Sequence, residues 1–319
     1  MLAIVCPGQG SQTPGFLAPW LEIDGLRERL AGWSTSLGTD LVAHGTTSDA
    51  DTIKDTAVAQ PLIVAAGLLT LDALLADPPE GVGAALASST GVLAGHSVGE
   101  FTAAVCAGVL TATDAIDLVG VRGRAMAQAS AVTPTGMSAV LGGDPAEVLE
   151  ALERHGLTPA NVNGAGQVVA AGTTEQLAAL AADPPARARV IALSVAGAFH
   201  THHMAPAVEA LEEAATQVVP SEPAVTLLSN ADGAPVVTGA DALARLVSQV
   251  SNPVRWDLTM STMVAMGVTG MLELAPAGTL TGLAKRAMKG VELLALKTPD
   301  DLDAARALVA AHRPVEDHR

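Results

Sequence analysis

Tyrosine is absent from this 319-residue sequence, and aromatic residues make up only 2% of it. Proteins that bind nucleic acid commonly stack the bases on aromatic rings above a basic surface. This chain has few rings and a formal net charge of -16 at pH 7, so its composition argues against nucleic acid and anionic membranes as partners. Because hydrophobic residues still make up 49% of the chain, the core must be built mainly from Ala, Val, Leu, Ile and Met.

Cysteine and long uninterrupted apolar runs are scarce as well. Cys6 and Cys106 are the two cysteines, and they lack the spacing of metal ligands, so we expect buried free thiols in a reducing compartment. Gly, Pro or charged residues interrupt each apolar run before it reaches the length that spans a membrane. Residues 1–6 are too short for the apolar region of a secretory signal. We therefore expect a cytoplasmic protein.

The segment around Ser97 has the strongest chemical signature in the chain. Residues 91–94 predict a short buried strand, and residues 101–109 predict a helix closed by glycine. Between them, residues 95–99 fit Gly-x-Ser-x-Gly, the nucleophile elbow, which requires this strand–turn–helix context. The helix N-terminus offers free N–H groups to the oxyanion that forms when a serine attacks an acyl group. A chain rich in glycine and alanine can also produce the motif by chance, but the flanking elements favour a nucleophile.

A glycine-rich turn follows the first predicted strand, residues 2–6. Gly8-x-Gly10 lacks the third glycine of a dinucleotide fingerprint, because Thr13 follows in its place. The Gly-Lys-Ser/Thr of a P-loop is absent too. Two interpretations remain: the turn presents backbone N–H groups to an anion, or it is a glycine turn without a ligand.

Two arginines lie among apolar residues in a helix that we predict from the Thr113-Asp114 cap to about Ala129. Burying a guanidinium without a partner is costly, so at least one of them should meet an anion. We expect Arg122 to do so and Arg124 to lie on a solvated face.

Two long helices are expected in the N-terminal part. Apolar residues at helical spacing, including both Trp20 and Trp33, predict a helix over residues 17–37. A polar stretch over residues 51–60 turns at Pro61, and residues 62–75 then predict a strongly apolar, buried helix.

The hydrophobic pattern of the sequence changes from about residue 136, and from there it predicts the order β-α-β-β-α-β. The predicted strands are 137–141, 160–163, 167–172 and 189–193, and the helices between them are 145–155 and 173–182. This order is that of the ferredoxin-like split unit. The length of the chain suits a large domain with such a smaller one inserted.

Three histidines lie within four positions, at His200, His202 and His203. A catalytic zinc needs three converging ligands, and so tight a run cannot direct all three rings at one ion. We therefore expect no metal, and we expect one of these histidines to act as the general base for Ser97.

Taken together, the ordered motifs resemble the bacterial malonyl-CoA:acyl carrier protein transacylases of type II fatty-acid and polyketide synthesis. The resemblance runs almost end to end. It rests on Pro7-Gly8-Gln9-Gly10-Ser11-Gln12, Gly95-His96-Ser97-Val98-Gly99-Glu100, Arg122-Gly123-x-x-Met126, Asn163 with Gln167 to Gly172, Phe199-His200 with Met204, Gln249 with Asn252-Pro253-Val254-Arg255-Trp256, and Gly282-Leu283-x-Lys285-Arg286.

The resemblance implies the parts of the catalytic centre. Ser97 would be the nucleophile and His200 its general base and acid. Gln249 lies where the family holds the other ring nitrogen of that histidine with an uncharged oxygen. The backbone N–H groups of Gln9 and Val98 would form the oxyanion hole.

It also implies how the substrate is recognised. Arg122 would grip the free carboxylate of the malonyl group, since a guanidinium meets a carboxylate with two parallel hydrogen bonds. His96 and Asn163 line the same cleft in the family. Phe199, before the histidine, resembles the malonyl-selective form, and Thr201 departs from the serine usual there.

The implied fold is α/β. It has an α/β-hydrolase-like core with a parallel sheet over residues 1–128 and 196–319, and a ferredoxin-like small subdomain over residues 129–195.

The implied substrates are malonyl-CoA and a phosphopantetheinylated acyl carrier protein, with no cofactor. Carrier proteins are usually acidic, so the basic cluster of Lys285, Arg286 and Lys289 is a candidate docking patch; an ordinary solvated helix face is the alternative. Fatty-acid and polyketide synthesis both fit, and we expect a monomer.

Two other functions need weighing. A serine hydrolase orders its triad Ser, acid, His, with a late histidine. Here more than a third of the chain follows His200, and the late histidines are His312 and His318 in a polar tail. A non-catalytic carrier-protein or CoA-binding module should have lost Ser97, His200 or Arg122, and all three are present.

Overall fold

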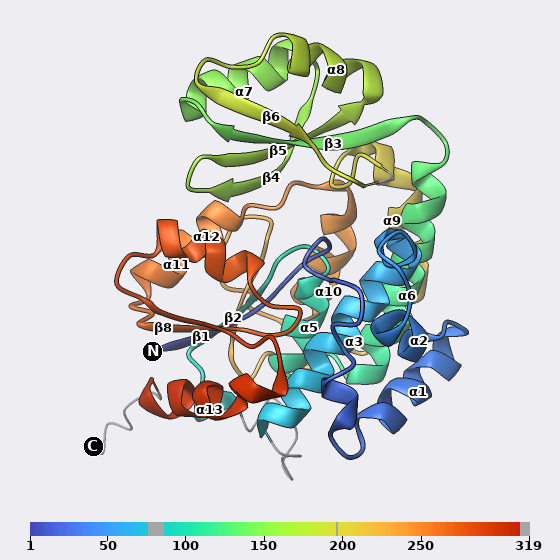
Figure 1. Cartoon of the computed structure of the whole chain (residues 1–319), viewed down its shortest axis with the longest axis vertical. Helices are drawn as coiled ribbons and strands as arrows, with labels where there is room; N and C mark the ends of the chain where they lie inside the picture. Colours follow the sequence, from blue (N-terminus) through green and yellow to red (C-terminus); the bar gives the residue numbers. More distant parts are fainter. Residues whose placement is uncertain (76–85, 196, 313–319) are drawn as a thin grey trace.

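The computed structural model describes residues 1–75, 86–195 and 197–312. Two sheets organise them: a five-stranded sheet of order β7-β2-β1-β8-β9, whose paired strands are parallel, and a four-stranded antiparallel sheet of order β4-β5-β3-β6 (Figure 1). The strands are β1 (Leu2–Cys6), β2 (Val92–Gly95), β3 (Thr135–Gly142), β4 (Thr158–Gly164), β5 (Gln167–Thr173), β6 (Ala188–Ala192), β7 (Thr226–Leu228), β8 (Gly270–Glu273) and β9 (Glu292–Ala295).

Helices surround the parallel sheet and cover one face of the antiparallel sheet (Figure 1). The α-helices are α1 (Leu26–Leu37), α2 (Leu41–Thr46), α3 (Thr56–Leu75), α5 (Gly99–Cys106), α6 (Ala112–Ser130), α7 (Pro145–Arg154), α8 (Thr174–Ala182), α9 (Ala205–Ala215), α10 (Gly239–Ser248), α11 (Trp256–Ala265), α12 (Thr279–Ala287) and α13 (Leu302–Ala311). The 3-10 helices are η1 (Trp20–Glu22), η2 (Thr52–Lys54), η3 (His202–Met204), η4 (Gln249–Ser251) and η5 (Pro299–Asp301).

Strand β1 is apolar at every position because it is buried on both faces, as strands of a helix-covered parallel sheet are. Leu2 and Ile4 pack in the core cluster shared with α3, α5 and α6. Ala3 and Val5, which alternate with them, pack in a second cluster with α11 and α12. The pleat thus divides one continuous apolar run between two layers of helices.

The functional edge of this sheet follows from its parallel register. Cys6 at the end of β1 lies opposite Gly95 at the end of β2, and Ala94 of β2 lies opposite Leu228 at the end of β7. The segments that leave these three strands therefore meet at one edge, where open parallel sheets place their ligands.

The antiparallel sheet has one face covered by its own helices. Val140 and Ala170 pack with Val148 of α7 and Leu180 of α8 in a separate small core. The opposite face is turned toward the rest of the molecule (Figure 1). Edge strand β4 is joined to the large part through Val254, whose N–H donates to Ala160 O and whose O accepts from Val162 N–H.

Helix α3 starts at Thr56, so the prediction of a polar loop that turns at Pro61 was wrong. Pro61 lies inside the helix, and Asp55 caps its start by accepting from Ala57 N–H. The free energy gained by burying apolar residues on all sides of this helix outweighs the loss of the one backbone hydrogen bond that proline removes. The helix is long and apolar enough to cross a membrane by length and composition, but 83% of its apolar 18-residue window is buried within the protein.

The single helix predicted over residues 17–37 was also wrong. The chain makes a short 3-10 turn at Trp20–Glu22 and begins α1 only at Leu26. Gly25 precedes it with φ of +83°, a left-handed conformation that breaks the helix.

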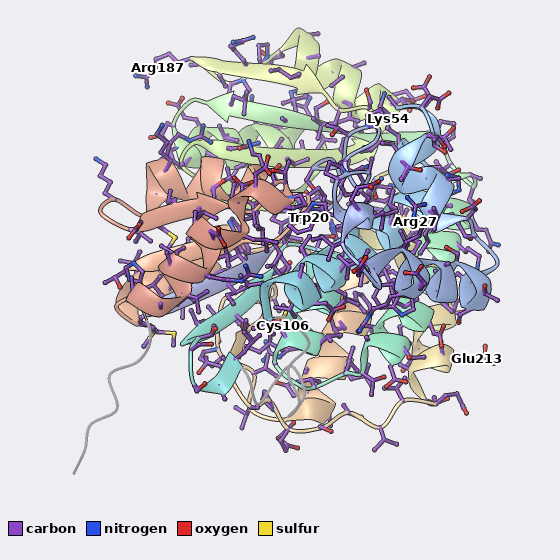
Figure 2. The ribbon with its side chains drawn as sticks, turned by 60° about the horizontal axis from the view of Figure 1, so that its bottom comes forward. Trp20, Arg27, Lys54, Cys106, Arg187 and Glu213 are labelled. Carbon is purple, nitrogen blue, oxygen red and sulfur yellow. The ribbon has the colours of Figure 1, made fainter. Side chains whose placement is uncertain are left out.

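Other expectations about burial are confirmed. Cys6 and Cys106 are buried free thiols, and Arg124 is exposed. Figure 2 shows Trp20 and Cys106 among the packed elements, whereas Arg187 and Glu213 project from the outside of the molecule. The fold therefore has an interior rich in Leu, Val and Ala and a surface that carries most of the acidic side chains.

Candidate active site

Ser97 lies in the sharp turn between β2 and α5, as the elbow motif predicts. Its φ is +53°, a strained conformation for a residue with a side chain. A Cβ on Gly95 would collide with the backbone of Gly99, and a Cβ on Gly99 would collide with the carbonyl of Cys6. Both glycines are thus needed because the strand, the turn and the helix approach one another within backbone contact.

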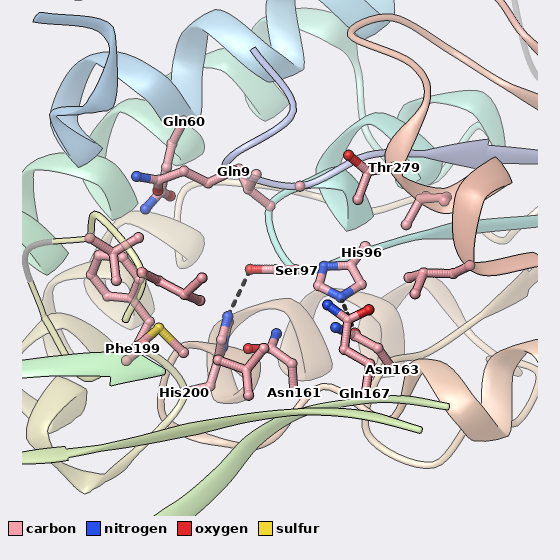
Figure 3. A pocket seen from close by; sticks show the side chains of 18 of the residues that line it. Gln9, Gln60, His96, Ser97, Asn161, Asn163, Gln167, Phe199, His200 and Thr279 are labelled. Atoms are coloured by element: carbon pink, nitrogen blue, oxygen red, sulfur yellow. Dashed lines mark hydrogen bonds between the residues drawn. The ribbon is translucent and has the colours of Figure 1, made fainter. Parts of the chain in front are cut away.

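His200 reaches Ser97 from a loop that precedes α9, across the edge of the parallel sheet (Figure 3). Its Nε2 lies 2.9 Å from Ser97 Oγ. Its Nδ1 lies 3.1 Å from the main-chain O of Gln249 and 2.9 Å from the side-chain Nε2 of the same residue. A proton on Nδ1 that is donated to the Gln249 carbonyl leaves Nε2 free to accept from the serine, which is the tautomer a general base requires. In that tautomer the Gln249 side-chain Nε2 is a close neighbour of Nδ1 and not its hydrogen-bond partner, because both groups are donors.

Arg122 lies beside this pair and is only 1% exposed. Its guanidinium donates to Gln60 Oε1, to Gln249 Oε1 at 2.9 Å and to Ser97 Oγ at 3.3 Å. Its Nε has no hydrogen-bond partner among the described residues. Arg122 is thus a buried cation beside the serine, and all of its acceptors among the described residues are uncharged oxygens. A ligand carboxylate would supply the negative charge that this guanidinium lacks.

Burial and this cation act on the histidine. Burial lowers the pKa of His200, the positive charge of Arg122 lowers it further, and the pKa falls to about 3. Burial also lowers the pKa of Arg122, to about 10, although the nearby Glu100 opposes the change. At neutral pH the histidine is therefore an uncharged base and the arginine remains a cation.

Gln9 and Val98 line the pocket near Ser97. Neither the Gln9 N–H nor the Val98 N–H donates to any residue in the described part of the chain. Gln9 is held by its side chain, which accepts from Thr56 Oγ1 at 2.7 Å and donates to Lys54 O at 3.2 Å. The glycine turn after β1 is thereby fixed to η2 and the start of α3, beside the cavity.

A cavity of about 350 Å³ opens above the serine, between the parallel sheet and the open face of the antiparallel sheet (Figure 3). Phe199, 6% exposed, lines it beside His200. His96 Nε2 lies 2.9 Å from Asn163 Oδ1 on β4, and burial lowers the pKa of this ring. Asn161 of the same strand also lines the cavity. The cavity thus combines apolar side chains such as Phe199 with polar groups from Ser97, His200 and the β4 amides.

The basic cluster lies beside the entrance. Lys285, Arg286 and Lys289 are exposed, and Arg286 lines the cavity together with Leu283 of α12. None of the three basic side chains forms an ion pair with a described residue. Of the three, Arg286 lines the cavity, and the role of the cluster in docking stays a prediction.

The remaining histidines lie apart from the serine. The rings of His202 and His203 are 4.1 Å apart, and among the described residues they belong to no group of three metal-ligating side chains. His312 lies 3.0 Å from Glu292 and 2.8 Å from Thr269 on the far side of the sheet. His318 lies outside the described residues.

Sequence analysis did not identify two polar residues of this site. Gln60 carries one oxygen that binds Arg122, but it stands beside Pro61 in a segment predicted as a polar loop. Asn230 binds the elbow from the end of β7, and no motif marks it. Neither residue carries a local sequence signal, because each reaches the site only through tertiary packing.

Comparisons with known proteins identify the family of the chain. A family model described as an acyl transferase domain matches residues 4–313. The chain is 52% identical over 303 residues to the malonyl CoA-acyl carrier protein transacylase of Mycobacterium tuberculosis, and the alignment covers 95% of this chain and 98% of that protein. It is 53% identical over 291 residues to the enzyme of that name from Mycolicibacterium smegmatis, covering 90% and 98%.

Solved structures give the same result. The crystal structure of MCAT from Mycobacterium tuberculosis has a TM-score of 0.91 and 51% identity, covering 96% of this chain and 99% of that one. The acyl-carrier-protein-S-malonyltransferase of Bartonella henselae has a TM-score of 0.89 and 30% identity, covering 97% and 99%.

Proposed function

The chain belongs to the acyl transferase family, and we propose that it is a malonyl-CoA:acyl carrier protein transacylase that works through a malonyl-Ser97 intermediate. The observation that carries the proposal is Arg122, a buried guanidinium 3.3 Å from Ser97 Oγ with uncharged described acceptors. A malonyl group bound to Ser97 would place its free carboxylate near that guanidinium. An acyl group without the carboxylate would leave the cation buried and unpaired, which costs affinity.

The first half-reaction uses the serine and the histidine. Ser97 Oγ attacks the thioester carbon of malonyl-CoA while its proton passes to His200 Nε2. The backbone N–H groups of Gln9 and Val98 stabilise the oxyanion. The tetrahedral intermediate collapses, CoA leaves as a thiol with the proton from His200, and the malonyl-serine ester remains.

The second half-reaction reverses these roles. His200 takes the proton of the phosphopantetheine thiol on the carrier protein, and the sulfur attacks the ester carbonyl. When the intermediate collapses, Ser97 regains its proton from His200 and malonyl leaves on the carrier protein. Two separate transfers through one covalent enzyme predict ping-pong kinetics.

The substrate carboxylate also assists the base. The charge of Arg122 is one cause of the low pKa of His200. A malonyl carboxylate that pairs with Arg122 offsets this charge, so the pKa of His200 rises when the substrate binds and the histidine accepts the serine proton more readily. Acetyl groups provide no such compensation, and this second effect adds to the selectivity.

Gln249 completes the catalytic centre without a negative charge. Its main-chain O orients the His200 ring, and its side-chain Oε1 accepts from Arg122. A carboxylate in this position would pair with Arg122 and compete with the substrate for it. A neutral amide keeps the guanidinium available.

We extend the proposal to partners and setting. The substrates are malonyl-CoA and a phosphopantetheinylated carrier protein, which docks on Lys285, Arg286 and Lys289 at the cavity entrance. His96, Asn163 and Phe199 shape the substrate pocket. The reaction needs no metal or cofactor, since the described side chains supply every proton transfer. The enzyme acts as a cytoplasmic monomer.

The finer description of the fold belongs to the same proposal. Residues 129–195 form a ferredoxin-like subdomain, supported by the β-α-β-β-α-β order and by the strand order β4-β5-β3-β6. The described residues within 1–128 and 196–319 form an α/β-hydrolase-like subdomain, supported by the parallel sheet and the elbow after β2.

Intact-mass measurement after brief mixing with malonyl-CoA tests the proposal. The wild type should gain one malonyl group, Ser97→Ala should gain none, and a holo carrier protein should discharge the adduct. If the wild type hydrolyses malonyl-CoA as fast as it transfers the group, the serine hydrolase alternative is favoured. If no adduct forms on the wild type, the covalent mechanism is wrong.

A further inference from the structure

We infer that Asn230 is a positioning residue of the active site: its side-chain amide holds the Ser97 turn in its strained conformation and directs the Ser97 N–H away from the oxyanion. The inference rests on the proposed role of Ser97 as nucleophile. Asn230 is fully buried, at 0% exposure, and follows β7, the parallel neighbour of β2.

Both polar atoms of the side chain bind the elbow. Asn230 Oδ1 accepts from the Ser97 N–H at 2.7 Å, and Asn230 Nδ2 donates to Gly95 O at 2.6 Å. One side of the amide can only accept and the other can only donate, so these two contacts fix its orientation. The amide thus spans the turn from the end of β2 to the serine itself.

The clamp acts where the backbone is strained. A φ of +53° at a non-glycine residue costs free energy and persists only if the surroundings enforce it. Without the Asn230 bonds the peptide at Ser97 can relax toward an ordinary conformation. Such a change would carry Oγ away from His200 Nε2, which now lies 2.9 Å from it.

The same bond decides which N–H groups meet the oxyanion. Because the Ser97 N–H is committed to Asn230, it points behind the turn and cannot stabilise the tetrahedral intermediate. The next N–H along the chain, that of Val98, and the Gln9 N–H are the ones without a described acceptor. Asn230 therefore helps to define the oxyanion hole that it does not itself line.

Asn230 is in turn held on both sides of its backbone. Its N–H donates to Glu100 Oε1 at 2.8 Å, and its O accepts from the Arg255 N–H at 2.8 Å. Glu100 lies in the first turn of α5, the helix that begins after the elbow, and is 6% exposed. The serine turn, Asn230 and α5 thus form one buried hydrogen-bonded unit.

The first test replaces Asn230 with Ala and compares it with Ser229→Ala. Ser229 is equally buried, at 3% exposure, and its hydroxyl accepts from Ala231 N–H rather than from the elbow. In single-turnover acylation by malonyl-CoA, Asn230→Ala should be slower by about 100-fold at saturating substrate, as expected for a misplaced nucleophile. The half-saturating malonyl-CoA concentration should stay near that of the wild type, and Ser229→Ala should acylate normally.

A second variant separates positioning from a loss of stability. Asn230→Asp keeps an acceptor for the Ser97 N–H, but its carboxylate faces the Gly95 oxygen. When protonated, the acid can donate to that oxygen as the amide does. The ratio of the Asn230→Asp rate to the wild-type rate should therefore rise as the pH falls from about 8.5 to about 5.5.

The outcomes decide the inference in either direction. A slow Asn230→Ala and an acid-rescued Asn230→Asp support it. It is overturned if folded Asn230→Ala acylates within about threefold of the wild type, or if the Asn230→Asp ratio is flat with pH. Failure of the wild type to form any malonyl adduct would refute the proposed function instead, because that result does not involve Asn230.

Discussion

Two positively charged regions of the molecule, one beside Ser97 and one at α12, differ in their exposure to solvent. Beside Ser97, Arg122 is 1% exposed and touches the reacting serine. On and just after α12, Lys285, Arg286 and Lys289 are exposed, and Arg286 lines the cavity. A buried charge interacts strongly with a partner, whereas an exposed charge is screened and contributes to encounter. Under the proposed function, the buried charge would select the acyl group and the exposed charges would recruit its macromolecular acceptor.

The largest expected effect on activity comes from removing the buried charge of Arg122. Arg122→Met should lower the rate of Ser97 acylation by malonyl-CoA by about 100-fold or more, because the carboxylate loses a bidentate, desolvated partner. Acylation by acetyl-CoA should fall far less, so the preference for malonyl should collapse. Arg124→Met, on the exposed face of the same helix, is the matched control and should behave as the wild type. Retained malonyl preference in Arg122→Met would contradict the account.

The next effect concerns pH. His200 accepts a proton only when neutral, and its pKa of about 3 keeps the free enzyme in that state throughout the weakly acidic range. Between pH 8 and pH 5, kcat/KM for malonyl-CoA should therefore show no loss from His200, whereas an ordinary histidine would cost about 30-fold at the acid end.

The pH profile of Arg122→Met tests the effect of the arginine charge on His200, because the substitution removes one cause of the low pKa of that histidine. Its acid limb should move to higher pH than that of the wild type. An acid limb that does not move in Arg122→Met would show that the charge of Arg122 does not act on the base. A wild-type profile that falls below a pKa near 6.5 would contradict the low pKa of His200 itself.

A smaller effect should follow from reversing the charges at α12. Lys285→Glu with Arg286→Glu should slow transfer to the carrier protein by about tenfold at low salt and less at high salt. Acylation by malonyl-CoA should be unaffected. Arg27→Glu with Arg187→Glu, two exposed arginines outside the cluster, changes the total charge by the same amount and is the control. An equal loss in both half-reactions would exclude a docking role.

The smallest effect is on stability, at Glu100 beneath the elbow. Burial raises the pKa of Glu100 to about 8, with Arg122, Arg245 and Asp232 as its charged neighbours. A raised pKa means that folding stability is lost as the pH rises from the unfolded value toward about 8. Glu100→Gln should therefore raise Tm relative to the wild type by about 2–4 °C at pH 8 and by less at pH 5. An equal difference at both pH values would contradict the assigned pKa.

The difference between the two regions also shows what sequence alone can predict. The elbow, the proposed general base and the arginine proposed to select the acyl group each carry a local signature: a glycine-framed serine, a histidine cluster, and a cation among apolar residues. The structure brings Ser97, His200 and Arg122 together. The β-α-β-β-α-β order followed from hydrophobic periodicity, because each element there has a clear turn or cap.

What escaped prediction depends on contacts between distant segments. Gln60 and Asn230 gain their importance only when α3 and β7 approach the elbow, and no local pattern encodes that approach. The same holds for α3, where burial overrides Pro61, and for the break at Gly25, which periodicity alone does not reveal. Tertiary packing decided each of these cases.

The most direct test of the central claim is a competition between equal concentrations of malonyl-CoA and acetyl-CoA for the wild-type enzyme, stopped before the first turnover is complete. Intact mass then gives the two Ser97 adducts in one spectrum. If the buried Arg122 selects the acyl group, the malonyl adduct should exceed the acetyl adduct by about 100-fold or more. Equal labelling by both substrates would show that the buried guanidinium does not select the acyl group.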